Sequence, residues 1–161
     1  MHTHSFHIRP FHPEDTEHVG HIYVEAIYAL AEHYTPDQCA AWAASADDRA
    51  AFGDRLLRGL TVVLETDGKI AAFGQLHPSN HIDLMFCATE FARRGFASRV
   101  LEYLEAEARS HDHTMIHTEA SLAARPFFER HGFQVVESEV VSRKGVDLRR
   151  FIMMKPLTQP S

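Results

Sequence analysis

The sequence predicts a mixed α/β fold in a single domain. The chain has 161 residues, of which 45% are hydrophobic and 24% charged, so it can bury one substantial core. Apolar runs of strand length alternate with segments whose apolar residues recur at helical spacing. Their order is one strand, two or three helices, three strands, a helix, a strand, a helix and two strands, which is typical of a layered α/β architecture. We expect one domain over residues 1–161, with a tail from about residue 156.

The first third of the chain predicts a strand followed by helices. Residues 5–9 alternate as a short strand, which two prolines end. The clearest helix start comes later, where Thr35 can act as the cap and Pro36 takes the first helical position. The expected helices are residues 15–31, 36–42 and 47–57.

The rest of the chain predicts strands joined by short turns, with two more helices. Asp67-Gly68 and Lys144-Gly145 are turn signals, and Gly132 is a natural left-handed helix cap. The expected strands are residues 60–65, 69–75, about 81 onward, 114–119, 133 onward and 148–154. The expected helices are one from the glycine at position 95 to about residue 109, and one over residues 122–130.

Composition excludes several classes of protein. The net charge of −6 argues against a general nucleic-acid binder, whose binding surface would be basic. No apolar run approaches the roughly 20 residues that cross a bilayer, and the N-terminus has no secretory signal. The two cysteines, Cys39 and Cys87, do not indicate a disulfide framework. We therefore expect a cytoplasmic protein that binds neither nucleic acid nor membranes.

Thirteen histidines are unusually many for this length. His2, His4 and His7 alternate near the start, as do His111 and His113 later, and alternation can place two imidazoles on one side of a strand. A histidine-rich terminus and an exposed loop have the same appearance. Because no cysteine or carboxylate completes a ligand set, we assign no metal site.

A basic turn follows the strand that begins near residue 81. Arg93 and Arg94 precede Gly95, and a helical pattern follows. The first amides of a helix lack internal partners, and the helix dipole adds partial positive charge there, so such a turn can hold phosphate. An ordinary strand-to-helix junction with two solvated arginines has the same sequence features. The Walker P-loop and G-x-G-x-x-G patterns are absent.

Two segments about 35 residues apart resemble the GNAT acyltransferase superfamily. Residues 93–97 resemble its Q/R-x-x-G-x-G/A pyrophosphate loop, and residues 124–133 resemble its A-x-x-F-Y-E-x-x-G-F segment. Residues 33–38 and 41–43 bring the chain close to the YafP-like branch. The resemblance implies a mostly antiparallel sheet flanked by helices, with its fourth and fifth strands splayed apart. It also implies an acetyltransferase that uses acetyl-CoA as acetyl donor.

The resemblance further implies where the cofactor lies. Its pantetheine arm would occupy the gap between the splayed strands, and its pyrophosphate would lie at the basic turn. The residues implied to contact it are Met85, Phe86, Cys87, Arg93, Arg94, Gly95, Phe96, Ala97, Ser98, Ser121 and Phe127. The chain departs from the family at two positions. Ala92 stands where Gln or Arg is usual, and Phe128 stands where many relatives have a tyrosine that protonates the departing thiolate.

Two carboxylates are the candidate catalytic groups. Amine acetylation needs a neutral amine held in line with a thioester, and a base helps because alkyl amines are mostly protonated at pH 7. Asp83 is the first candidate, because it lies inside an apolar strand and matches the position of the basic glutamate of histone acetyltransferases. Glu119 and His81 are the second choices for the base. An aspartate satisfied by neighbouring amides is the alternative for Asp83.

The acceptor pocket is expected from the first helices. Tyr28, His33, Tyr34 and Trp42 are candidate walls, and aromatic side chains there suit a small amine with an apolar or aromatic body. The overall acidic charge favours a cationic acceptor. We expect direct attack in a ternary complex and allow for a homodimer. The alternative is an acyl-CoA-binding regulator or partner-binding module with little or no transferase activity, which Phe128 would favour.

Overall fold

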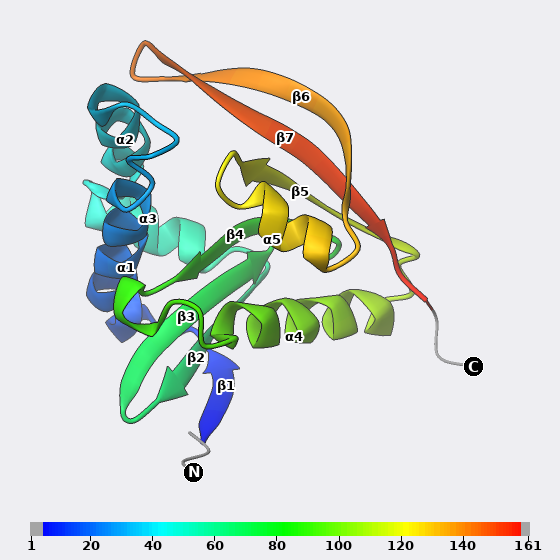
Figure 1. The fold of residues 1–161 in the computed structure, drawn as a ribbon. Coiled ribbons are helices and arrows are strands. Elements are labelled where there is room, and N and C mark those ends of the chain that lie inside the picture. Colours follow the sequence, from blue (N-terminus) through cyan, green and yellow to red (C-terminus); the bar gives the residue numbers. More distant parts are fainter. Residues whose placement is uncertain (1–4, 159–161) are drawn as a thin grey trace.

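The computed structural model describes residues 5–158, and its centre is one seven-stranded sheet in the order β1-β2-β3-β4-β5-β7-β6 (Figure 1). Neighbouring strands are antiparallel except for β4 and β5, which run parallel. The expectation of a mixed, mostly antiparallel α/β sheet is therefore confirmed. The strands are β1 (Phe6–Pro10), β2 (Leu60–Thr66), β3 (Lys69–Leu76), β4 (His81–Cys87), β5 (Met115–Ser121), β6 (Gln134–Arg143) and β7 (Val146–Pro156).

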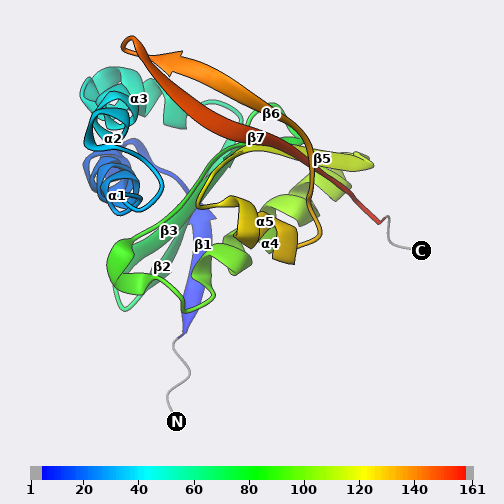
Figure 2. The same ribbon diagram turned by 45° about the horizontal axis from the view of Figure 1, so that its top comes forward.

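Helices cover both faces of this sheet (Figure 2). One face carries α1 (Thr16–Tyr28), α2 (Pro36–Ala43) and α3 (Arg49–Leu56), and the other carries α4 (Phe96–Ser110) and α5 (Arg125–Arg130). Across the described residues, no helix combines the length and apolar composition that spanning a membrane would require.

The core lies where the helices meet the central strands. Val100, Leu101 and Leu104 of α4 are fully buried, and a Cβ added at Gly74 of β3 would lie 2.8 Å from Val100 Cγ1. The absence of a side chain at Gly74 thus lets α4 approach the sheet closely. On the other face, the Tyr23 ring of α1 packs against Phe86 of β4 at 4.9 Å between centroids. Helices thus pack on both faces of the two central strands β3 and β4.

Several helix caps and turns form where the sequence predicts them. Thr35 caps α2: its Oγ1 accepts from the Gln38 amide at 3.2 Å, and Gln38 Oε1 accepts from the Thr35 amide at 2.8 Å. Asp67 and Gly68 form the β2–β3 turn, with φ of 53° and 74°. Gly132 takes the left-handed conformation after α5, with φ of 91°.

The boundaries of other elements differ from the sequence prediction. Helix α1 ends at Tyr28 rather than near Ala31, and a turn follows it. Helix α5 begins at Arg125 rather than 122, because the Ser121 hydroxyl accepts from the Ala124 amide and forms a turn first. A three-residue 3-10 helix, Thr89–Phe91, separates β4 from the basic turn.

The last strand, β7, is longer than the predicted residues 148–154. Pairing runs from Gln134↔Met154 to Arg143↔Val146, because a two-residue turn at Lys144 and Gly145 lets the ladder continue to its end. The expected tail also begins later. Strand β7 continues to Pro156, and Leu157 is buried and bonded through its amide to the Thr114 carbonyl at 2.8 Å. Residues 159–161 of the expected tail lie outside the described residues.

Candidate functional site

Strands β4 and β5 separate soon after they meet. They pair only at His81↔His117 and Ile82↔Thr118, although β4 continues to pair with β3 as far as Cys87. The splay expected between the fourth and fifth strands is therefore present. A cavity of about 540 Å³ lies at this gap, and residues of β4, β5, β7 and the first three helices line it.

Strand β4 has a β-bulge at Asp83, which lines this cavity. Gln75 of β3 pairs with Leu84 but Leu76 pairs with Ile82, so Asp83 has no partner across the ladder. A bulge of this kind changes the direction of a side chain and bends the strand. The Asp83 carboxylate accepts from Arg55 of α3, with Oδ2 3.3 Å from Nη2 and 3.4 Å from Nε. The neighbour of Asp83 is thus a guanidinium rather than the apolar strand environment that the sequence suggested.

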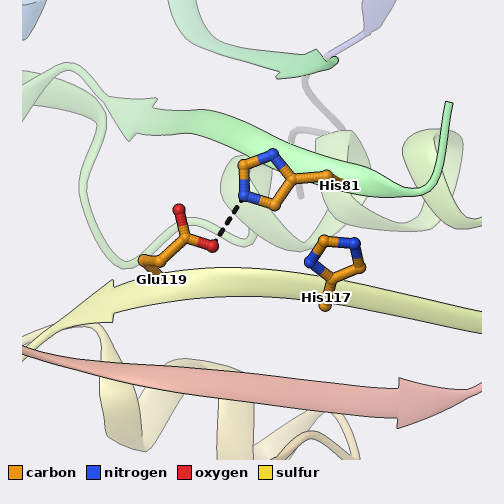
Figure 3. A group of neighbouring side chains, drawn as sticks. All are labelled: His81, His117 and Glu119. Atoms are coloured by element: carbon orange, nitrogen blue, oxygen red, sulfur yellow. Dashed lines mark hydrogen bonds and ion pairs between the residues drawn. The ribbon is translucent and has the colours of Figure 1, made fainter. Parts of the chain in front are cut away.

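Glu119 lies on β5 and also lines the cavity. Its Oε2 is 2.7 Å from His81 Nε2, and the His81 and His117 rings lie 4.7 Å apart (Figure 3). The hydrogen bond with His81 holds the pKa of Glu119 below its usual value despite burial. Burial acts to lower the pKa of His81, but the bonds to Glu119 and the His77 carbonyl raise it overall. Burial and the nearby His81 lower the pKa of His117.

Aromatic side chains form one wall of the cavity. Tyr34 and Trp42 line it, with their rings 5.5 Å apart. Tyr28 and His33 do not line it. Helix α1 presents Tyr23 and Ala26 to the cavity, and Leu30 follows in the next turn, so Tyr28 projects elsewhere and is 49% exposed.

The Tyr34 hydroxyl is held at the rim of the gap by two backbone groups. It accepts from the Leu122 amide and donates to the Arg149 carbonyl, each at 2.9 Å. Burial raises the pKa of Tyr34, while the bond from Leu122 acts in the opposite direction.

The basic turn lies at the other end of the gap, before α4. Arg93 and Gly95 both have left-handed backbone, with φ of 65° and 83°, and Gly95 caps α4. A Cβ added at Gly95 would have no atom within 4 Å, so the space beside it is open. Such backbone at a helix start can cradle an anion. The Ala92, Arg93 and Arg94 side chains are exposed here.

The remaining predicted cofactor residues fall into two groups. Met85, Phe86, Cys87 and Ser121 line the cavity, together with Phe128. Phe96, Ala97, Ser98 and Phe127 do not. Phe96 is buried against Phe91, and the Ser98 hydroxyl lies 2.9 Å from His131 Nε2, which joins α4 to α5. Phe127 packs on the His131 ring at 4.8 Å. Burial raises the pKa of the Cys87 thiol, so Cys87 is poorly suited to act as a nucleophile.

Comparison with known proteins identifies the family. The model of the acetyltransferase (GNAT) domain matches residues 30–155. The chain belongs to the GNAT acetyltransferase family. It is 31% identical over 148 residues to the uncharacterized N-acetyltransferase YafP of Escherichia coli strain K12, which covers 91% of this chain and 93% of YafP. The expected resemblance to this branch is confirmed.

Solved GNAT structures have the same fold. A GCN5-related N-acetyltransferase from Rhodopseudomonas palustris superposes with a TM-score of 0.93 at 30% identity, covering 98% of this chain and 99% of that one. PaiA N-acetyltransferase from Thermoplasma acidophilum, solved with coenzyme A, gives 0.76 at 15% identity, covering 94% and 99%. The ribosomal-protein-S18-alanine N-acetyltransferase of Escherichia coli gives 0.70 at 20% identity, covering 98% and 97%.

As a GNAT member, the chain is an N-acetyltransferase that uses acetyl-CoA as its acetyl donor. The observed site fits that cofactor. The open space at Gly95 suits a phosphate, and the part of β4 after Ile82 has no β5 neighbour to compete for its backbone groups. The two ends of the gap could thus accommodate different parts of acetyl-CoA, its phosphates at one end and its thioester at the other.

Arg55, which lines the cavity, and His117, which lies beside Glu119 but not at the cavity, were not singled out from the sequence. Arg55 lies on a short helix far from Asp83 in the chain, and no local pattern pairs them. His117 did have a signal: His117 and Glu119 alternate on one strand, and alternate residues of a strand share a face. The described structure brings this pair to His81, rather than joining the alternating histidines noted from the sequence. Of those, His2 and His4 lie outside the described residues.

Proposed function

We propose that this GNAT enzyme acetylates the amine of a small molecule that enters from the face covered by α1, α2 and α3. One observation carries the proposal: a single cavity joins the β4–β5 gap to two carboxylates, Asp83 and Glu119, and to the wall formed by Tyr34 and Trp42. A carboxylate can bind an ammonium group, and an aromatic wall suits an apolar or aromatic body. These two features support a cationic small amine.

The cofactor supplies an activated acetyl thioester. We assign its phosphates to Arg93, Arg94 and the backbone from Gly95 to Ser98, where the helix start is basic and open. Residues 85–87 and Ser121 would hold the arm in the gap, since they line it from opposite strands. Phe96 supports the turn from within the core, and Phe127 packs on His131, which is bonded to Ser98 of α4.

Asp83 and Glu119 would orient the amine and remove its proton. The two carboxylates come from β4 and β5, one on each side of the gap, so an amine between them would face a group held in the gap. Glu119 Oε2 is bonded to His81, which leaves the second oxygen of the carboxylate for the acceptor. Direct attack then needs no covalent enzyme intermediate.

The departing thiolate receives no proton from Phe128. This side chain is 3% exposed and packs against Phe127 and Phe133, at 5.3 and 5.1 Å between ring centroids. A phenyl ring has no proton to give, so we propose that the thiolate leaves unassisted or takes its proton from water. The absence of a phenol here is compatible with turnover, because a thiolate is a tolerable leaving group near neutral pH.

The test is release of CoA from acetyl-CoA with a panel of amines. The panel contains aromatic and aliphatic amines, their uncharged amide analogues, and a peptide with a free N-terminus. We expect turnover with small amines, and a fall of about 100-fold in kcat/KM in Asp83→Asn and Glu119→Gln with little change in CoA affinity. Glu102→Gln, at an exposed site on α4, is the matched control.

Two results would contradict the proposal. Preferential acetylation of the peptide would replace the small-molecule acceptor with a protein one. Tight CoA binding without release for any acceptor would instead favour the acyl-CoA-binding module.

A further inference from the structure

We propose that His81, His117 and Glu119 form a binding site for a transition-metal ion of the zinc class, at the base of the β4–β5 gap. Two imidazole nitrogens and one carboxylate oxygen form a ligand set that zinc accepts. The three ligand atoms lie within 4.8 Å of one another (Figure 3).

The sheet itself brings these groups together. His81 and His117 are register partners on adjacent parallel strands, and Glu119 follows His117 by two residues, on the same face. Their backbone positions are therefore fixed by strand pairing rather than by a loop. All three side chains are partly buried, so their ordering does not depend on the metal alone.

The orientation of His81 favours coordination through one nitrogen. Its Nδ1 lies 2.9 Å from the His77 carbonyl oxygen, which can only accept, so Nδ1 carries a hydrogen. Its Nε2 then points to Glu119, 2.7 Å away. A backbone carbonyl that receives the second N–H of a metal-binding histidine is the usual outer-shell arrangement at zinc sites.

The ligand atoms are close to the separations that zinc requires. With bonds of about 2.0–2.2 Å, ligand atoms around a tetrahedral ion lie roughly 3.4 Å apart. Coordination would draw the three ligand atoms together from separations of up to 4.8 Å. Metal binding would displace any proton between His81 Nε2 and Glu119 to solvent, and the fourth position would remain for water.

Glu119 connects this site to the cavity. It lines the cavity, whereas His81 and His117 do not. A metal ion that engages the Glu119 carboxylate would remove it from the acceptor. The metal would therefore inhibit acetyl transfer, a consequence that rests on the proposed function, whereas metal binding itself does not.

The binding test uses ZnCl₂ and the full chain, without cofactor or acceptor, in competition with a chromophoric zinc chelator. His117→Phe keeps an aromatic ring beside His81 but removes the nitrogen. His111→Phe, at an exposed position after α4, makes the same change away from the cluster. This pair is needed because the chain has thirteen histidines, and other histidines can bind zinc weakly.

We expect wild type and His111→Phe to share one tight zinc site, and His117→Phe to bind zinc at least about 100-fold more weakly. Loss of a ligand should exceed the 10–100-fold cost of losing an outer-shell partner. His117→Leu is a second variant if the phenylalanine does not fold. Equal zinc affinity in His117→Phe and wild type, or no tight site in wild type, would overturn the proposal.

The activity test separates the two proposals. We expect His117→Phe to retain CoA release with the best amine, and to lose the zinc inhibition seen in wild type and in His111→Phe. If zinc binds through His117 but leaves activity unchanged, the metal site stands and the assigned role of Glu119 falls. If activity is absent throughout, the binding measurements still decide the metal site.

Discussion

Tyr34 joins three parts of the chain through one hydroxyl. The residue lies between α1 and α2, is 5% exposed, and bonds to Leu122 after β5 and to Arg149 of β7. Tyr34→Phe would keep the ring but remove the partner of the Leu122 amide and of the Arg149 carbonyl, whose hydrogen bonds to Tyr34 are partly buried. We expect the free energy of unfolding to fall by about 1–3 kcal/mol.

Urea unfolding followed by circular dichroism measures this change. Tyr28→Phe removes the same atom from a side chain that is 49% exposed, and should change stability by less than about 0.5 kcal/mol. Equal effects of the two variants would show that the Tyr34 bonds contribute nothing measurable.

Asp15 gives the stability a defined pH dependence. Arg9 donates from Nη1 and Nη2 to the two carboxylate oxygens at 2.8 and 3.0 Å, which holds the pKa of Asp15 below its ordinary value of 3.8. The folded state thus binds fewer protons here than the unfolded state. The stabilisation is therefore complete well above pH 3.8, and it is lost as the pH falls through the folded pKa.

Asp15→Asn should accordingly lower the free energy of unfolding by about 2 kcal/mol at pH 7. The difference from wild type should shrink as the pH falls below 3.8. Urea unfolding between pH 7 and pH 3 measures it, with the exposed Asp54→Asn as control. A difference that stays constant with pH would show that the Arg9 pair does not cause it.

At the scale of elements, the start of α4 decides whether the cofactor binds. Gly95→Asp would place a carboxylate in the open space assigned to phosphate. We expect acetyl-CoA affinity to fall by at least about 100-fold, roughly 3 kcal/mol. Calorimetric titration measures this.

Gly68→Asp is the matched control for backbone strain. Gly68 also has positive φ, 74°, and open space around it, but it lies in the β2–β3 turn. If both variants lose binding equally, strain or misfolding is the cause. If neither does, the phosphate assignment at the basic turn is wrong.

The elements that local chemistry specifies could be predicted from the sequence. The capping box at Thr35 and Gln38 and the turn at Asp67 and Gly68 each depend on neighbours within four residues. The lengths of β6 and β7 could not be read this way. Their pairing continues over polar, exposed residues, where strand formation depends on the partner strand rather than on an apolar pattern.

The same distinction holds for the candidate site. Four of the candidates chosen from the sequence line the cavity: Asp83, Glu119, Tyr34 and Trp42. The residues that they contact could not be predicted. The bulge at Asp83 is a register shift against β3. Arg55 comes from α3, a separate helix, and its guanidinium contacts the Asp83 carboxylate. Tyr28 and His33, the other two candidate walls, do not line the cavity: Tyr28 lies on another side of α1, and His33 lies in the turn that follows the helix.

At the scale of the whole molecule, the sheet has two halves with a narrow connection. β1 to β4 form one half and β5 to β7 the other, and only two residue pairs join β4 to β5. A further link joins α2 to β7, where Gln38 Nε2 donates to the Asp147 carbonyl at 2.9 Å. In Figure 1 the turn between β6 and β7 lies near α2.

A ligand in the gap should therefore stabilise both halves together. At 100 times its Kd, a ligand that binds only the folded state adds about 2.7 kcal/mol, which raises the Tm by about 5–10 °C for a chain of this size. We expect saturating CoA to produce this shift in wild type and in Gly68→Asp, but not in Gly95→Asp. Differential scanning fluorimetry measures it.

Hydrogen exchange tests where the stabilisation acts. If CoA bridges the gap, it should slow exchange at residues 84–87 of β4 and at residues 121–124 after β5, because both segments line the cavity. Protection of the α4 start alone would mean that the phosphates bind without the arm entering the gap. The acetyl group would then lie far from Asp83 and Glu119, and the acceptor would have to be sought on another face.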